Sequence, residues 1–204
     1  MNNILFDNNL EYIKSINRLW VDVYPFLVDA IIEKYRRNSG RVLEIGPFSG
    51  GITVELARRY SKMQFSIYTW QKDVKDYIKE EIDKAKLKER VKIYIGPSKT
   101  FEIYNNCFDL IISRGALFFL DSNLFKETYR IMCPGGLGYI GGGYGYKTPQ
   151  ALIDKIHAES HWLNQQLGKN WVSKDWLENL LLDVQLSNRC HIEEKGGLWV
   201  ILRK

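Results

Sequence analysis

Short apolar runs alternate with amphipathic segments between residues 40 and 141, and this alternation constrains the fold more than any other feature of the sequence. The apolar runs cover residues 41–46, 64–70, 91–95, 107–113 and 136–141. Between them, apolar residues recur every three or four positions, which predicts helices over 49–60, 73–87 and 121–132. Because strands separated by helices form parallel sheets with helices on both faces, the sequence predicts an α/β fold.

The two ends of the chain depart from this alternation. Apolar residues at helical spacing run from Leu10 to Tyr35, but Pro25 falls inside the pattern. Since proline removes a backbone donor and clashes with the preceding turn, we expect either a kink or two helices with Pro25 in the first turn of the second. After Gly141, the pattern predicts helices near 149–167 and 173–184, and then two strands near 189–194 and 198–202 that form an antiparallel pair.

Length and composition favour one domain. The chain has 204 residues, of which 45% are apolar, and this content is enough for one substantial core. We therefore expect a single domain over 1–204, with an N-terminal helical lid over 1–39 and the α/β core over 40–204. No run of about 18 apolar residues exists and the first residues do not resemble a signal peptide, so we expect a cytoplasmic protein without a membrane partner.

Charge and cysteine content exclude little. A net charge of +5 permits a nucleic-acid partner without favouring one, because the densest charged stretch, 72–92, carries eight basic and six acidic residues. The three cysteines, Cys107, Cys133 and Cys190, lack the paired spacing of a zinc site and are expected to be reduced thiols. We expect no bound metal, and the oligomeric state is left open.

The turn after the first predicted strand indicates a ligand. In "VLEIGPFSGGIT", Val42 to Thr53, Glu44 ends the strand, Gly46 opens the turn and Gly50 precedes a helix. Glycine removes the Cβ that would block a ligand lying across the turn, and the helix presents unpaired N–H groups. Open α/β sheets bind ligands at the carboxyl edge of their strands. The turn therefore predicts a nucleotide-like ligand at that edge.

Four sequence blocks resemble the class I S-adenosylmethionine-dependent methyltransferases. "VLEIGPFSG" looks like the first motif of this family, and "CFDLIISRGALFFL" like its fourth strand and the following loop. "FKETYRIMCPGGLGYIGG" resembles the next helix, turn and fifth strand, and "GGLWVILRK" the last strand. The resemblance covers most of residues 40–204. It implies a Rossmann-like three-layer sandwich whose seven-stranded, mostly parallel sheet has the order 3-2-1-4-5-7-6, with an antiparallel last pair.

The resemblance also implies S-adenosyl-L-methionine as cofactor and a set of residues around it. We expect Glu44 to reach the α-amino group of the methionine moiety, Gln71 to bond the ribose hydroxyls and Trp70 to pack on the adenine. The residues that the resemblance assigns to the cofactor are Glu44, Gly46, Pro47, Phe48, Ser49, Gly50, Thr69, Trp70, Gln71, Ser98, Ser113 and Arg114.

The chain departs from the family pattern at three positions. Phe48 stands where a second glycine is usual, so the turn runs differently or the ring points away from the cofactor. Gln71 replaces the acid that usually ends the second strand, and Ser98 replaces an acid after the third. A dinucleotide-binding protein is the alternative, but the turn lacks G-x-G-x-x-G and no acid ends the second strand.

Methyl transfer from a sulfonium needs alignment and a dry pocket more than it needs a specific catalytic group. A base is required only if the acceptor loses a proton. The candidates for a catalytic role are Arg114, Tyr144, Tyr146, His157 and His161, and those for binding the substrate are Trp20, Tyr24, Tyr144, Tyr146 and His157. For Arg114, binding an anionic acceptor group and pairing with a neighbouring carboxylate are both open. His157 and His161 are four residues apart, so they lie on the same side of the predicted helix, at the border of its apolar stripe. Three roles are open for them: a metal-binding pair, a catalytic or acceptor-binding role, or ordinary histidines at that border.

The glycine-rich stretch "PGGLGYIGGGYGYKTP", Pro134 to Pro149, is close to a phosphate-binding loop. Tyr146 stands where the pattern G-x-x-x-x-G-K-[ST] requires its last glycine, so this interpretation is disfavoured. We expect instead a flexible active-site loop over 141–147, with Thr148 capping the next helix, and a plain flexible linker is the alternative.

The sequence therefore predicts an S-adenosylmethionine-dependent methyltransferase that acts on a small-molecule acceptor. An RNA or protein methyltransferase is the first alternative, because the pI is near 9.0. A non-catalytic protein that binds the cofactor is the second, because of Phe48 and the missing ribose acid.

Overall fold

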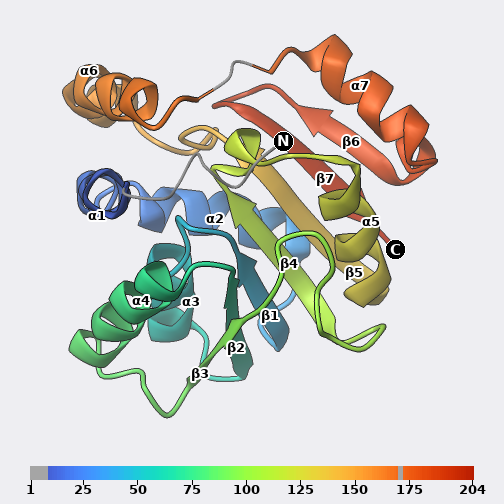
Figure 1. Cartoon of the computed structure of the whole chain (residues 1–204), viewed down its shortest axis with the longest axis horizontal. Coiled ribbons are helices and arrows are strands. Elements are labelled where there is room, and N and C mark those ends of the chain that lie inside the picture. Colours follow the sequence, from blue (N-terminus) through green and yellow to red (C-terminus); the bar gives the residue numbers. More distant parts are fainter. Residues whose placement is uncertain (1–8, 170–171) are drawn as a thin grey trace.

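The computed structural model describes residues 9–169 and 172–204, and their strands form one seven-stranded sheet with helices on both faces (Figure 1). The strands are β1 (Gly40–Ile45), β2 (Met63–Thr69), β3 (Val91–Ile95), β4 (Phe108–Arg114), β5 (Met132–Gly142), β6 (Cys190–Glu193) and β7 (Leu198–Arg203). The helices are α1 (Leu10–Leu19), α2 (Tyr24–Tyr35), α3 (Gly51–Arg59), α4 (Lys72–Lys84), α5 (Ser122–Ile131), α6 (Gln150–Gln166) and α7 (Lys174–Asp183). Two short 3₁₀ segments complete the described structure, Ala116–Phe118 and Ser187–Arg189.

The strand order is β3-β2-β1-β4-β5-β7-β6. The first five strands in this order pair in parallel, and β7 pairs antiparallel with both β5 and β6. The predicted topology is therefore confirmed. Parallel strands place their carboxyl ends at one edge, so the turns that follow β1, β2, β4 and β5 lie close together.

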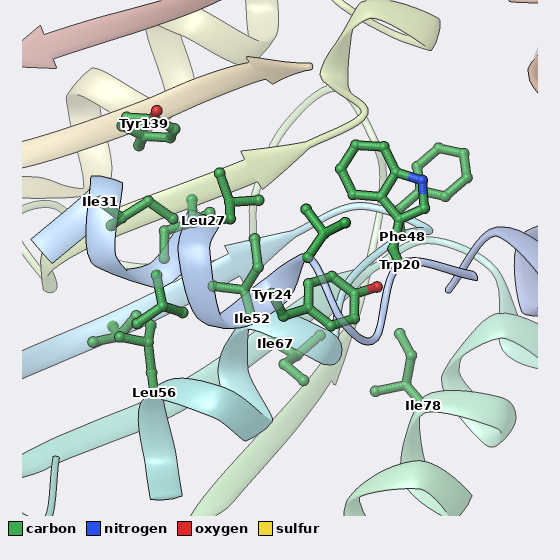
Figure 2. Close-up of a cluster of buried hydrophobic side chains, with 14 of the residues drawn as sticks. Trp20, Tyr24, Leu27, Ile31, Phe48, Ile52, Leu56, Ile67, Ile78 and Tyr139 are labelled. Atoms are coloured by element: carbon green, nitrogen blue, oxygen red, sulfur yellow. The ribbon is translucent and has the colours of Figure 1, made fainter. Parts of the chain in front are cut away.

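Successive residues of the central strands point to opposite faces and build two cores. Val42 and Leu110 belong to the cluster under α2, α3 and α4, part of which Figure 2 shows. Leu43 and Ile111 belong to the cluster under α5 and α7. The sheet is buried on both faces, which explains why its strands read as continuous apolar runs.

Local signals explain several boundaries. Pro25 lies in the first turn of α2, so the two-helix interpretation of the N-terminal segment is confirmed. Asp121 accepts a hydrogen bond from the Leu124 amide and starts α5, and Ser173 accepts one from the Trp176 amide and starts α7.

Two expectations in the glycine-rich stretch are wrong. Thr148 does not cap α6, because its Oγ1 donates to the Tyr144 carbonyl at 2.5 Å and Pro149 occupies the N-cap position. β5 begins at Met132 instead of residue 136, and the Gly135 amide donates to the carbonyl of Lys204 just beyond β7. The second difference comes from a contact between segments that are distant in sequence, whereas Thr148 bonds to a carbonyl only four residues earlier.

The N-terminal helices have different surroundings. α2 packs on α3 and contributes Leu27 and Ile31 to the core (Figure 2). α1 lies beside α6 (Figure 1), and the indole Nε1 of Trp20 donates to Ser160 Oγ at 3.2 Å. The described residues include no helix with the length and apolar character needed to span a membrane.

Candidate functional site

A buried carboxylate shapes the turn after β1. The Oε2 atom of Glu44 accepts hydrogen bonds from the Gly50 amide at 2.9 Å, the Thr53 amide at 3.0 Å and Thr53 Oγ1 at 2.7 Å. Burial raises the pKa of Glu44 above its ordinary value, although these hydrogen bonds and Arg114 act to lower it. Through Oε2, Glu44 therefore ties the loop after β1 to the N-terminal residues of α3. Its second oxygen, Oε1, makes none of these bonds.

The two glycines of the turn adopt conformations that other residues avoid. Gly46 has φ +112° and Gly50 has φ +113°. A Cβ on Gly46 would lie 2.7 Å from Cζ of Phe119, and the Phe119 ring packs edge-to-face on Trp70 with centroids 4.9 Å apart. Phe119, which the sequence analysis did not single out, forms an aromatic wall with Trp70 beside the turn. The phenylalanine pair after β4, inside a block that resembles the family, was the available signal.

Polar atoms without partners gather at this edge of the sheet. In the described part of the chain, eight buried side-chain polar atoms lack a hydrogen-bond partner, and five belong to predicted cofactor residues. The five atoms are Glu44 Oε1, Ser49 Oγ, Thr69 Oγ1, Gln71 Oε1 and Arg114 Nε. An unsatisfied buried polar atom costs about 1–3 kcal/mol, so such atoms rarely cluster without a purpose. The cluster matches a ligand rich in hydroxyl and amino groups.

Four other predicted cofactor residues have no buried side-chain polar atom without a partner in the described structure. The Phe48 ring is buried and packs on Phe118 with centroids 5.2 Å apart. Ser113 Oγ donates to the Ile45 carbonyl at 3.1 Å and joins β4 to β1. Pro47 is buried in the turn, and Ser98 is half-buried in the loop after β3.

Arg114, the last residue of β4, is 4% exposed and lies among aromatic rings. Its Nη2 donates to Asn17 Oδ1, to Tyr24 Oη at 3.1 Å and to the Phe48 carbonyl at 2.8 Å. The guanidinium carbon is 4.9 Å from the Trp20 ring centroid, 5.3 Å from that of Tyr24 and 5.4 Å from that of Phe48. The alternative in which Arg114 pairs with a carboxylate is wrong within the described residues, where no ion pair includes it.

Hollows lined by described residues lie near this edge. One of about 250 Å³ lies between α1, α3 and α4, and Tyr24, Ser49 and Gly50 line it. A second, of about 260 Å³, lies between the end of β5 and α6, and a third, of about 30 Å³, adjoins it beside Arg114. The second hollow, here called the β5 cavity, is lined by Trp20, Leu117, Gly142, Gly143, Tyr144, His157, Ser160, His161, Asn164, Lys169, Val172, Gly196, Gly197 and Leu198.

Most of the predicted acceptor residues meet in the β5 cavity. The rings of Trp20 and Tyr144 stack with centroids 4.9 Å apart and an interplanar angle of 11°. The imidazoles of His157 and His161 are 6.1 Å apart. No group of three or more His, Cys, Asp or Glu residues in the described ranges is arranged to hold a metal ion. Lys169 also lines the cavity, although no motif in the sequence pointed to it.

The loop after β5 is held in place along its length, in contrast to the predicted flexibility. The Gly145 amide donates to the Gly196 carbonyl at 2.8 Å, and Tyr146 Oη donates to Glu33 Oε1 of α2 at 2.6 Å. Tyr146 is not among the residues lining the β5 cavity, so of the two predicted tyrosines only Tyr144 lies there.

Comparisons with known proteins agree with this geometry. The sequence model of a family described as "Methyltransferase domain" matches residues 42–136, which include the Gly46 turn and Arg114. A solved structure from Methanococcus maripaludis, assigned to the S-adenosyl-L-methionine-dependent methyltransferases, has a TM-score of 0.78 and 28% identity. The match covers 94% of this chain and 91% of that chain. No curated protein matches this sequence.

Two further structures share the fold. An S-adenosylmethionine-dependent methyltransferase from Aquifex aeolicus has a TM-score of 0.65 and 16% identity, over 93% of this chain and 98% of that one. Geranyl diphosphate C-methyltransferase from Streptomyces coelicolor, solved with S-adenosyl-L-homocysteine, has a TM-score of 0.62 and 14% identity. That match covers 86% of this chain and 73% of the other chain.

Proposed function

Because the chain is a class I S-adenosylmethionine-dependent methyltransferase, we propose that it methylates a small-molecule acceptor bound in the β5 cavity. The observation that supports this proposal is the position of Arg114, which belongs to the cluster of unpartnered polar atoms and also lines the small cavity that adjoins the β5 cavity. Donor and acceptor then approach each other from two sides of the end of β4, as an in-line displacement requires.

The cofactor is S-adenosylmethionine, and the unpartnered atoms fit its chemistry. We propose that Gln71 Oε1 accepts from a ribose hydroxyl and that Glu44 Oε1 faces the α-amino group. Trp70 and Phe119 supply an apolar wall for the adenine. When bound, the cofactor supplies an electrophilic methyl group on a sulfonium. The residues of the chain bind it, orient it and exclude water.

The size of the β5 cavity favours a small acceptor. Its volume is about 260 Å³, near the lower limit of small-molecule pockets, about 300–1,000 Å³. Trp20, the residue after α1, and α6 line it together, because Trp20 bonds to Ser160 of α6 and stacks on Tyr144. An RNA or protein methyltransferase, the alternative motivated by the basic pI, needs an open surface beside the methyl group instead.

The side chains of the β5 cavity include proton acceptors. We propose that His157 or His161 accepts a proton when the attacking atom of the acceptor must lose one. Arg114 is buried and acts by position and charge, because a guanidinium does not give up its proton.

Cofactor binding is tested by calorimetry with S-adenosylmethionine and S-adenosylhomocysteine. Gly46→Ala inserts a Cβ against Phe119 at a positive φ, so we expect at least about a tenfold loss of affinity, equal to about 1.4 kcal/mol. The matched control is Gly135→Ala, at φ +75° near the opposite edge of the sheet, which should retain wild-type affinity. Equal affinities of both variants would refute the placement of the cofactor.

The acceptor class is tested by incubating the enzyme and labelled S-adenosylmethionine with cell extract. We expect the label in the low-molecular-weight fraction. Label that is lost from the large fraction after ribonuclease or protease treatment would establish the RNA or protein alternative instead.

A further inference from the structure

Three of the unpartnered polar atoms at the ends of β1 and β2 are closed off by the protein around them. They are Glu44 Oε1, Thr69 Oγ1 and Gln71 Oε1, and all three atoms are buried. A ligand bonds such an atom only when its own donor comes within about 3 Å, and a buried atom leaves no room for that donor. A group that covers these atoms must therefore move before a ligand can bind them.

The ring of Phe119 covers the turn beside these atoms. A Cβ added to Gly46 would lie 2.7 Å from Cζ of this ring and 3.3 Å from Cε1, so the ring fills the surface that the glycine leaves open. The same ring meets Trp70, the residue before Gln71, edge-to-face with centroids 4.9 Å apart. A ligand that lies across Gly46 therefore needs the space that the Phe119 ring occupies.

Phe119 lies on a short segment between two fixed points. Before it, Arg114 is 4% exposed at the end of β4, and after it, Asp121 caps α5. Between them, Gly115 has φ +67°, a conformation that glycine enters easily. Phe119 itself is half-buried, and its amide donates locally, to the Ala116 carbonyl at 2.9 Å. Its ring can therefore change position while the sheet and α5 stay in place.

Trp70, the other half of the aromatic pair, is tied more firmly to the sheet. It follows the last residue of β2 directly, and the carbonyl of that residue, Thr69, accepts a hydrogen bond from the Gly96 amide at 3.2 Å. The backbone beside Trp70 is thus joined to the loop after β3. Of the two rings, Phe119 is the one that is free to move.

We propose that Phe119 is a gate for the cofactor, because its ring must leave Gly46 before S-adenosylmethionine can reach the buried polar atoms. This inference rests on the proposed placement of the cofactor at the Gly46 turn. Only molecules with an open gate bind, so the fraction of open molecules scales the apparent association rate constant. Minor conformations of this kind have populations of about 0.1–10%, so the ring slows association about tenfold or more.

The test is rapid mixing with S-adenosylhomocysteine, followed by tryptophan fluorescence, which gives the association and dissociation rate constants. Phe119→Ala removes the ring, so we expect its association rate constant to rise about tenfold or more. Phe119→Leu keeps a smaller side chain and should give a smaller rise. A fixed wall predicts a different result, namely unchanged association and faster dissociation, because loss of a contact acts mainly on dissociation. That result would overturn the proposal.

Tyr104→Ala is the matched control, because it removes an aromatic ring that is 89% exposed in the loop between β3 and β4. It should keep the wild-type association rate constant, and an equal rise in Tyr104→Ala and Phe119→Ala would also contradict the gate. Circular dichroism and thermal unfolding establish that each variant is folded. If Phe119→Ala does not fold, Phe119→Leu gives the comparison with wild type.

The gate and the placement of the cofactor fail in different ways. Equal affinities of Gly46→Ala and Gly135→Ala for S-adenosylhomocysteine would overturn the placement, and the gate with it. Loss of affinity in Gly46→Ala, together with unchanged association in Phe119→Ala, would overturn the gate alone and leave the proposed function standing.

Discussion

Glu44 is fully buried and uses one carboxylate oxygen for three hydrogen bonds, while the other has no partner. Loss of water around the charged form is the largest influence on its pKa, which is raised. The residue that fixes the turn therefore carries a charge that folding disfavours. This cost is a mark of a functional position, because a neutral residue would fill the same space more cheaply.

The raised pKa of Glu44 predicts a pH dependence of stability. The folded state binds the proton more tightly than the unfolded state, whose pKa is about 4.3. The protonated Glu44 carboxyl therefore contributes to the free energy of unfolding. This contribution is fully present below about pH 4.3 and is lost as the pH rises through the folded-state pKa. Glu44→Gln stays neutral and escapes this loss. We therefore expect the free energy of unfolding of the variant, relative to wild type, to increase with pH in urea titrations.

The control for this experiment is Glu159→Gln, which removes a carboxylate from the exposed face of α6. Its stability relative to wild type should change little with pH. A difference between Glu44→Gln and wild type that is constant from acid to neutral pH would contradict the assigned pKa shift.

At the scale of elements, α1 is attached to α6 through one buried hydrogen bond and the packing around it. Trp20 Nε1 and Ser160 Oγ lie 3.2 Å apart, and the two residues are 6% and 2% exposed. Because both residues also line the β5 cavity, this contact shapes the cavity in which we propose that the acceptor binds.

Ser160→Ala removes the acceptor of the Trp20 indole. We expect a loss of about 0.5–1.5 kcal/mol in the free energy of unfolding, with faster hydrogen exchange in α1. Urea unfolding and exchange measured by mass spectrometry check both effects. Glu159→Ala, at the exposed neighbouring position, should change neither, and unchanged exchange in α1 of Ser160→Ala would show that the contact does not hold the helix.

The ends of β5 and β7 approach each other through glycine backbones. A Cβ on Gly143, at φ +128°, would lie 2.3 Å from the Gly197 Cα, and no flexible side chain is available to move aside. A Cβ on Gly142 would meet the Leu117 side chain, with Cδ1 at 3.2 Å and Cγ at 3.5 Å. Alanine substitutions at these two adjacent positions therefore compare a clash with backbone atoms, at Gly143, with a contact to a movable side chain, at Gly142.

Gly143→Ala should lower the free energy of unfolding by about 1–3 kcal/mol or more, because strain and overlap act together. Gly142→Ala should cost clearly less, since a leucine side chain can shift. Denaturant titration of the two variants gives the comparison. Equal losses would mean that the two loops separate easily and do not define the wall of the β5 cavity.

The elements differ in how well the sequence predicts them. The parallel α/β sheet was predicted from apolar runs that alternate with helical patterns, and its strand order from the resemblance of four blocks to the family. Local sterics at Pro25 predicted a kink or a break between two helices, and the structure has the break. The position of Lys169 depends on which distant segments pack beside it, because Lys169 lines a cavity that includes residues of β5 and α6. No local pattern encodes this contact. Thr148 differs, because its hydroxyl bonds to the Tyr144 carbonyl four residues earlier in the same loop and does not cap α6.

At the scale of the whole molecule, the fold brings two chemically different spaces to one edge. The cluster around Gly46 offers unpartnered polar atoms from β1, β2 and the turn between β1 and α3. The β5 cavity offers cations and apolar surface from β5, α6 and the residue after α1. Arg114 lies between them at the end of β4, and its bonds to Asn17 and Tyr24 tie the N-terminal helices to the sheet. Binding on either side therefore stabilises a shared structure.

Ligand binding at this edge should raise the stability of the whole fold. A ligand that binds only the folded state stabilises it by about 2.7 kcal/mol at 100 times its dissociation constant. For a domain of this size, that corresponds to a rise of about 5–11 °C in Tm. We expect S-adenosylhomocysteine to produce such a shift in wild type and in Gly135→Ala, and to produce little or none in Gly46→Ala.

Differential scanning calorimetry at several ligand concentrations measures this linkage, because the shift must grow with the logarithm of the concentration. Lys169→Met should show the wild-type shift with S-adenosylhomocysteine, since its charge borders the acceptor space and not the turn at Gly46. A missing shift in Lys169→Met would mean that the two spaces are one binding site. The proposal that donor and acceptor bind on two sides of the end of β4 would then have to be abandoned.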